Sequence, residues 1–216
     1  MRIGLFGGSF DPVHVGHLAM AEQALHQAGL DEVWFLPAAA APHKPGKSQA
    51  NFQSRLDMLH LATAGHHRLK TCAIEKDLPT PSYTINTIRA LSTNHPGNQW
   101  YFILGGDMLA DLPLWREPGQ IVAMAGLVVM PRPGSTAPNS EDLRLKLGKP
   151  VRLLALEGPA LEVSSGWIRS TLASGGSVRY LVPRAVERYI QEHELYGAAE
   201  PADPEKPLAQ TGVTNA

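Results

Sequence analysis

The chain has 216 residues, and at about 150 residues per domain this length predicts one domain with room for a short extension. Hydrophobic residues make up 44% and charged residues 18%, a globular composition that excludes a wholly disordered chain. The formal net charge of −1 at pH 7 argues against a basic surface for nucleic acid, and the single cysteine excludes an intramolecular disulfide framework.

No segment has the features of a targeting signal or of a membrane span. The N-terminus carries one positive charge before an apolar run that is too short for a signal peptide. The longest apolar run, residues 121–130, is shorter than the roughly 18 to 20 residues that cross a membrane. We therefore expect a cytoplasmic protein that binds neither nucleic acid nor membrane.

Short apolar runs alternate with segments of helical periodicity along most of the chain. The predicted strands are residues 2–6, 33–36, 69–74, 99–104, 126–130 and 151–156. The predicted helices are residues 14–28, 51–64, 82–91, 164–172 and 184–193. This alternation predicts an α/β fold with a mostly parallel, doubly wound sheet and helices on both faces. Ligands of such sheets bind outside the carboxyl ends of the strands.

The last part of the chain differs in composition from the rest. Residues 197–216 hold three prolines, no aromatic residue and few aliphatic ones. We predict a single domain over residues 1–196, with closing helices from about residue 164, and a disordered tail over residues 197–216.

The first predicted strand leads into the sequence GGSFDPVHVGH at residues 7–17. Gly7 and Gly8 lack a Cβ, so the backbone there can approach a ligand closely. His14 and His17 are three residues apart at a helix start, where they share one face beside N–H groups that favour a phosphate. These residues alone leave open a metal site or no function, although few other metal ligands lie near them.

A second motif, SSGWIR, occupies residues 164–169 at the start of a predicted helix. Ser164 or Ser165 can cap this helix, and their hydroxyls together with Arg169 can hold a polyphosphate. A capped helix with one arginine is common, so this motif gains weight only beside the first.

The first motif resembles the GxFDPxHxGH signature of the HIGH-motif nucleotidyltransferases, and the second resembles their SSTxIR motif, with Gly166 in place of the threonine. The resemblance implies a Rossmann-like fold that binds a nucleoside triphosphate at the first turn. The role of the missing threonine hydroxyl is not carried over. The implied ATP-binding residues are Gly7, Gly8, Ser9, Phe10, His14, His17, Gly105, Asp107, Ser164, Ser165, Ile168 and Arg169.

Four further segments are similar to the nicotinate-nucleotide adenylyltransferase family: PHK at residues 42–44, PSYT at 81–84, GGD at 105–107 and LPLW at 112–115. The family usually has alanine or glutamine where this chain has Gly106. The resemblance implies transfer of the adenylyl group of ATP to nicotinate mononucleotide, giving deamido-NAD and pyrophosphate in NAD biosynthesis, with Mg²⁺ carried on the ATP phosphates. The implied substrate-binding residues are His43, Lys44, Tyr83, Thr84, Asp107, Leu112, Trp115 and Arg132.

The residue types fit these roles without requiring them. Thr84 can offer a hydroxyl and an N–H group to a carboxylate, but it can equally be a simple helix cap. Trp115 can stack on a flat ring, although a tryptophan so placed is more often part of the core. By resemblance, Tyr83 and Thr84 lie at the nicotinate carboxylate and Trp115 stacks on the pyridine.

The predicted catalytic residues are His14, His17, Lys44 and Arg169, with no metal site formed by the protein itself. Three rival functions remain open. A phosphopantetheine adenylyltransferase shares the first motif but should lack PSYT and LPxW, and a nicotinamide mononucleotide enzyme would keep the fold with a different carboxylate pocket. A nucleotide-sensing module would bind ATP without releasing pyrophosphate. The expected partners are ATP and nicotinate mononucleotide, with a homo-oligomer left open.

Overall fold

The structure is a computed structural model that describes residues 1–39, 50–131, 139–159 and 161–198. His43, Lys44 and Arg132 therefore lie outside the described residues, as do residues 199–216 of the predicted tail. No helix among the described residues has the length and apolar character to cross a membrane.

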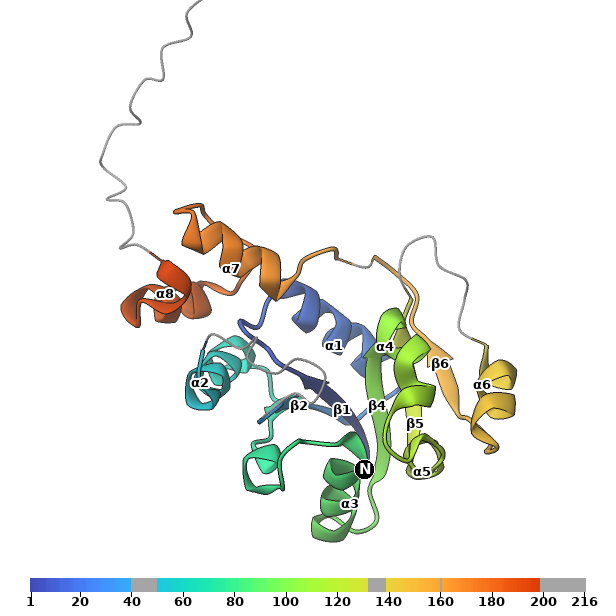
Figure 1. Cartoon of the computed structure of the whole chain (residues 1–216). Helices are drawn as coiled ribbons and strands as arrows, with labels where there is room; N and C mark the ends of the chain where they lie inside the picture. The colour runs from blue at the N-terminus through green and yellow to red at the C-terminus, as the bar shows by residue number, and fades with distance from the viewer. Residues whose placement is uncertain (40–49, 132–138, 160, 199–216) are drawn as a thin grey trace, which may run out of the picture.

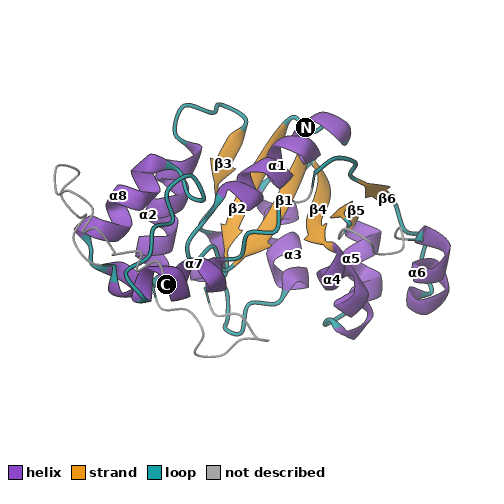
Figure 2. Cartoon of the chain, turned by 90° about the horizontal axis from the view of Figure 1, so that it is seen from above, coloured by secondary structure: helices purple, strands orange, loops and turns teal. Residues whose placement is uncertain are grey.

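Six strands form one sheet in the order β3-β2-β1-β4-β5-β6, and Figure 2 shows them side by side. The strands are β1 (Arg2–Gly8), β2 (Glu32–Pro37), β3 (Leu69–Thr71), β4 (Gln99–Gly105), β5 (Ala125–Met130) and β6 (Leu153–Ala155). Each neighbouring pair is parallel. The predicted α/β class and parallel sheet are confirmed.

Helices cover both faces of the sheet (Figure 1). They are α1 (Val15–Gln27), α2 (Phe52–Thr63), α3 (Thr84–Asn94), α4 (Gly106–Asp111), α5 (Pro118–Met124), α6 (Ser140–Leu147), α7 (Ser165–Ala173) and α8 (Arg184–Glu192). The described residues also form three 3₁₀ turns: η1 (Ile74–Asp77), η2 (Leu112–Leu114) and η3 (Leu195–Gly197). One hydrophobic cluster packs α1, α2, α7 and α8 on one face, and a second cluster packs α3 to α6 on the other.

Two of the sequence predictions were wrong in local structure. The strand predicted at residues 69–74 ends at Thr71, and η1 follows it. The short helices α4, α5 and α6 were not predicted. Leu143 is the one buried residue of α6, so that helix shows little apolar periodicity, and α5 runs directly into the apolar β5.

The strand β1 lies in the middle of the sheet, between β2 and β4. After β1 the chain passes to α1 on one face, whereas after β4 it passes to α4 on the other. The strand order therefore reverses between β1 and β4, which is where doubly wound sheets open a crevice for ligands.

Candidate active site

The loop between β1 and α1 is held in shape by an aromatic cluster beneath it. Phe10 has a positive φ of 47° and is fully buried. Its ring packs edge-on against Phe6, Phe35 and His17, with centroids 5.0 to 5.5 Å away. A Cβ on Gly8 would lie 3.0 Å from the Phe10 ring, so the glycine is needed for this packing whether or not a ligand approaches. Since the Phe10 side chain is buried, only its backbone can contact ATP.

His14 and His17 form a stacked pair at the start of α1. Their ring centroids are 3.7 Å apart, and a Cβ on Gly16 would lie 3.1 Å from His14 Nδ1. His17 Nδ1 accepts a hydrogen bond from the His14 backbone N–H at 3.3 Å, so the neutral His17 ring carries its proton on Nε2. The buried Nδ1 of His14 has no hydrogen-bond partner among the described residues. The protein therefore fixes one side of the His17 ring by a hydrogen bond, whereas the His14 ring is held by stacking on His17.

Both imidazoles are neutral at physiological pH. Burial lowers the pKa of His14 to about 4. Burial, together with the neighbouring His14, lowers the pKa of His17 well below its ordinary value. A neutral imidazole still has one N–H to donate. The pair can therefore offer N–H donors to phosphate oxygens.

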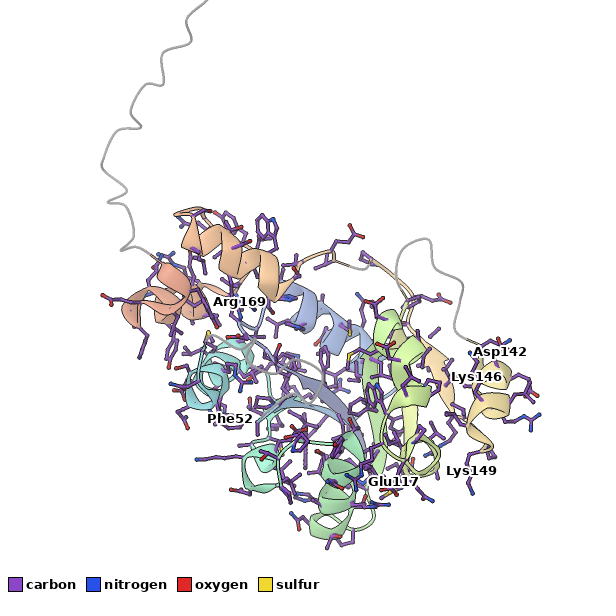
Figure 3. The ribbon with its side chains drawn as sticks, viewed as in Figure 1. Phe52, Glu117, Asp142, Lys146, Lys149 and Arg169 are labelled. Carbon is purple, nitrogen blue, oxygen red and sulfur yellow. The ribbon has the colours of Figure 1, made fainter. Side chains whose placement is uncertain are left out.

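The second motif joins the first through α7. Ser164 caps α7 by accepting a hydrogen bond from the Trp167 N–H at 3.1 Å, as predicted, and Ser165 Oγ donates to the Pro12 carbonyl at 2.9 Å. Arg169 Nη1 donates to the Asp11 carbonyl at 2.7 Å. Figure 3 shows Arg169 on the side of α7 that faces α2 and the sheet. The structure thus brings the two predicted phosphate motifs together.

A cavity of about 420 Å³ opens beside this junction, and its walls come from α1, the β4–α4 turn, the end of β5, Pro159 and residues 161–164. Gly16, Gly105, Asp107 and Ser164 line it. No atom lies within 4 Å of the position of a Cβ on Gly105, so this side is open. The Val15 N–H donates to the Leu181 carbonyl at 2.9 Å. Gly16 is the first residue of α1 that lines the cavity.

The residues predicted to bind the pyridine nucleotide lie at the start of α3 and after η2. Tyr83 precedes α3, Thr84 is its first residue, and the Arg116 guanidinium lies 4.8 Å from the Tyr83 ring centroid. Trp115 is half-buried and meets Phe102 edge-on at 5.9 Å. The side chains of two predicted ligand-binding residues, Leu112 and Ile168, are fully buried, so only their backbones can contact a substrate.

The sequence analysis did not predict a role for Arg55, a buried arginine that forms hydrogen bonds with two loops of the site. It donates from Nη1 to the Ser9 carbonyl at 2.8 Å and from Nη2 to the Ala38 carbonyl at 2.9 Å. These bonds join the loops that follow β1 and β2. An arginine on the apolar face of α2, beside Met58 and Leu59, was the signal available in the sequence.

Metal binding by the histidine pair finds no further support in the described ranges. They contain no group of three or more histidine, cysteine, aspartate or glutamate side chains that could hold a metal ion. Gly16, which lies between the two histidines in the sequence, lines the cavity beside them.

This parallel sheet, with two motifs meeting at its switch point, defines a class of nucleotide-binding enzyme. The family model described as "Cytidylyltransferase-like" matches residues 5–171, and the chain belongs to that family of nucleotidyltransferases. The match covers β1 through most of α7, which includes both phosphate motifs.

Within that family, two similar proteins have the same name. A protein of Synechococcus sp. (strain JA-3-3Ab) is 46% identical over 197 residues, 90% of this chain and 94% of its own length. A protein of Geobacillus kaustophilus (strain HTA426) is 41% identical over 214 residues, 99% of this chain and 89% of its own. Both are named "Probable nicotinate-nucleotide adenylyltransferase". The chain belongs to the nicotinate-nucleotide adenylyltransferase family, so the predicted resemblance is confirmed.

A solved structure supports the fold. Plasmodium falciparum nicotinic acid mononucleotide adenylyltransferase, complexed with NaAD, matches with a TM-score of 0.75 at 20% identity, over 92% of this chain and 98% of that one. The Rossmann-like architecture predicted for this chain is therefore confirmed.

Proposed function

We propose that the chain transfers the adenylyl group of ATP to nicotinate mononucleotide, with release of pyrophosphate and deamido-NAD. The observation that carries this proposal is the neutral, stacked pair of His14 and His17 at the start of α1, with Gly16 between them on the wall of the cavity. A sensing module would need only to bind ATP. Two stacked imidazoles, one of them fixed with its N–H on Nε2, suit a reaction in which charge moves between phosphate oxygens.

The reaction needs no general base, because the attacking phosphate of nicotinate mononucleotide is already anionic. Its oxygen forms a bond to the α-phosphorus of ATP, and the bond from that phosphorus to the bridging oxygen of the β-phosphate breaks. Pyrophosphate takes the electron pair and leaves. The protein supplies positioning and charge stabilisation, with His17 Nε2–H donating to a phosphate oxygen as charge develops.

The leaving pyrophosphate is assigned to Arg169, whose side chain keeps 20% of its surface exposed, and to Lys44, whose role stays a prediction. Mg²⁺ usually keeps several water ligands. It is bound by substrate phosphates together with one or two protein carboxylates. Asp107 and Glu162 line the cavity, so the residues present fit an ion carried on ATP. Mg²⁺ would neutralise phosphate charge there.

The pyridine end is assigned to the start of α3. That helix has no acidic residue in its first turn and no side-chain cap at Tyr83. Its N-terminal N–H groups and dipole favour a carboxylate over a neutral amide. Thr84 can add a hydroxyl, and the half-buried Trp115 offers a ring face to the pyridine.

The test is pyrophosphate release from ATP and Mg²⁺ with nicotinate mononucleotide, nicotinamide mononucleotide or phosphopantetheine as the sole acceptor. We expect turnover with the first, and far slower turnover with the other two. Faster turnover with either of the others would refute the assigned substrate while leaving the phosphate chemistry. ATP binding without turnover would refute the enzyme and favour a sensor. This assay tests neither the predicted cytoplasmic location nor the possible homo-oligomer.

A further inference from the structure

The last described turn of the chain reaches back to the phosphate loop. Tyr196, in η3, is 8% exposed, and its hydroxyl donates a hydrogen bond of 2.6 Å to Asp11 Oδ1, 185 positions earlier. Tyr196 has a positive φ of 61°, a conformation that side chains with a Cβ rarely adopt. A strained backbone that places one buried hydroxyl suggests a site requirement.

Asp11 is the residue on which several parts of the site converge. It is 1% exposed, and its Oδ1 also accepts a hydrogen bond from the Ala50 N–H at 3.2 Å, just before α2. Its backbone carbonyl accepts from Arg169 Nη1 at 2.7 Å. The same Nη1 lies 3.8 Å from Asp11 Oδ2, which is beyond hydrogen-bond distance. Tyr196 and Arg169 thus approach one buried residue from two elements.

The hydroxyl of Tyr196 binds Oδ1 of the buried carboxylate, and the Arg169 guanidinium lies within ion-pair range of Oδ2 without a hydrogen bond to it. A buried carboxylate that loses a donor is costly, and a nearby guanidinium is the strongest replacement. Without the hydroxyl, we expect Arg169 to move onto the Asp11 carboxylate. An arginine held there would have fewer N–H groups to offer to pyrophosphate.

We propose that Tyr196 is a positioning residue for adenylyl transfer, whose hydroxyl satisfies Asp11 and thereby keeps the Arg169 guanidinium directed to the phosphates. The proposal rests on the function proposed above. It makes η3, the last described turn, part of the active site. The sequence analysis assigned Tyr196 no role.

The experiment compares Tyr196→Phe with a matched control, Tyr189→Phe. Tyr189 lies on α8, and its hydroxyl donates to Asp57 Oδ2 on α2 at 3.1 Å, so each variant removes one tyrosine hydroxyl bound to a carboxylate. We expect Tyr196→Phe to lower kcat by about tenfold, the scale of one hydrogen bond to a charged group, without a matching change in the KM for nicotinate mononucleotide. Tyr189→Phe should keep the kcat of the native chain.

A double-variant cycle tests the route through Arg169. In an Arg169→Ala background, Tyr196→Phe should cause no further loss of kcat, because the arginine that it misplaces is absent. Equal kcat and KM values for the two phenylalanine variants would overturn the proposal. An undiminished effect of Tyr196→Phe in the Arg169→Ala background would overturn it as well.

A second double variant tests the same route from the carboxylate. Asp11→Asn combined with Tyr196→Phe removes the buried charge that attracts Arg169, so kcat should rise above that of Tyr196→Phe alone. No rise in a folded double variant would overturn the proposal. Turnover by the native chain is measured first, so a failure of the proposed function appears there. A failure of the Tyr196 inference appears only in the comparison of variants.

Discussion

His17 has one task in the structure and a second task in the proposed function, and a pair of substitutions can distinguish them. Its Nδ1 accepts the His14 backbone N–H at 3.3 Å, which satisfies a donor at the start of α1. Its Nε2–H is assigned to a phosphate oxygen. Glutamine at the same helix position can provide the capping oxygen. Alanine provides neither the cap nor the donor.

We expect His17→Ala to lower kcat by about 10²- to 10³-fold, or about 2.7 to 4 kcal/mol, by analogy with loss of one donor to a developing oxyanion. It should also lower the free energy of unfolding by about 1 kcal/mol, because the capping acceptor is lost. His17→Gln should restore most of the unfolding free energy while kcat stays low, because its amide cannot reproduce the position of Nε2–H.

The assay is pyrophosphate release at saturating ATP and nicotinate mononucleotide, with urea unfolding of each variant. His26→Ala is the control, since His26 is an exposed histidine in the last turn of the same helix and should leave kcat unchanged. A loss of less than about tenfold for folded His17→Ala would refute the catalytic role, since one oxyanion donor supplies more than that. Recovery of kcat in His17→Gln would instead show that capping explains the loss.

Three further outcomes follow from burial and exposure. Because the pKa of His14 is about 4 in the fold and about 6.5 when exposed, stability should fall as pH drops from 6.5 towards 4, by about 2 kcal/mol at pH 5 from this residue; urea unfolding should show the fall flattened in His14→Gln. Burial raises the pKa of Glu75, although the Thr87 hydroxyl donates to it at 3.1 Å, so ionisation opposes folding as pH rises. Glu75→Gln should therefore raise the urea midpoint at pH 8 and lose that advantage near pH 4; a constant difference would contradict this. Trp115→Ala should raise the KM for nicotinate mononucleotide by about three- to tenfold, the scale of one aromatic stacking contact, in initial-rate measurements; an unchanged KM would remove Trp115 from the pocket.

Those parts of the site that depend on local spacing were predictable from the sequence. The histidine pair lies at the start of α1, and the Ser164 cap lies at the start of α7. At each helix start, residue type and helical period decide the geometry. The parallel sheet followed from the alternation of apolar runs. The short α4 could not be found in this way, because six residues beginning with Gly106 give no readable period.

The remainder depends on contacts between distant parts of the chain. The lowered pKa values of the two histidines come from burial against the packed fold, which no local pattern contains. The sequence gives Gly8 a ligand-approach role, but its place under the Phe10 ring appears only once the loop is folded. Roles predicted for His43, Lys44 and Arg132 stay predictions, as does the tail from residue 197.

The proposed phosphate site is built from both ends of the described chain. Its first part follows β1, the central strand, whereas α7 and η3 return from beyond the edge strand β6 to the same loop (Figure 1). Ser165 binds the Pro12 carbonyl, and Tyr196 binds the Asp11 carboxylate. Since these late bonds complete the loop that carries the histidines, the nucleotide site is complete only when the last described turn has packed. Substitutions in α7 and η3 are therefore expected to affect turnover more strongly than their distance in sequence from the histidine pair suggests.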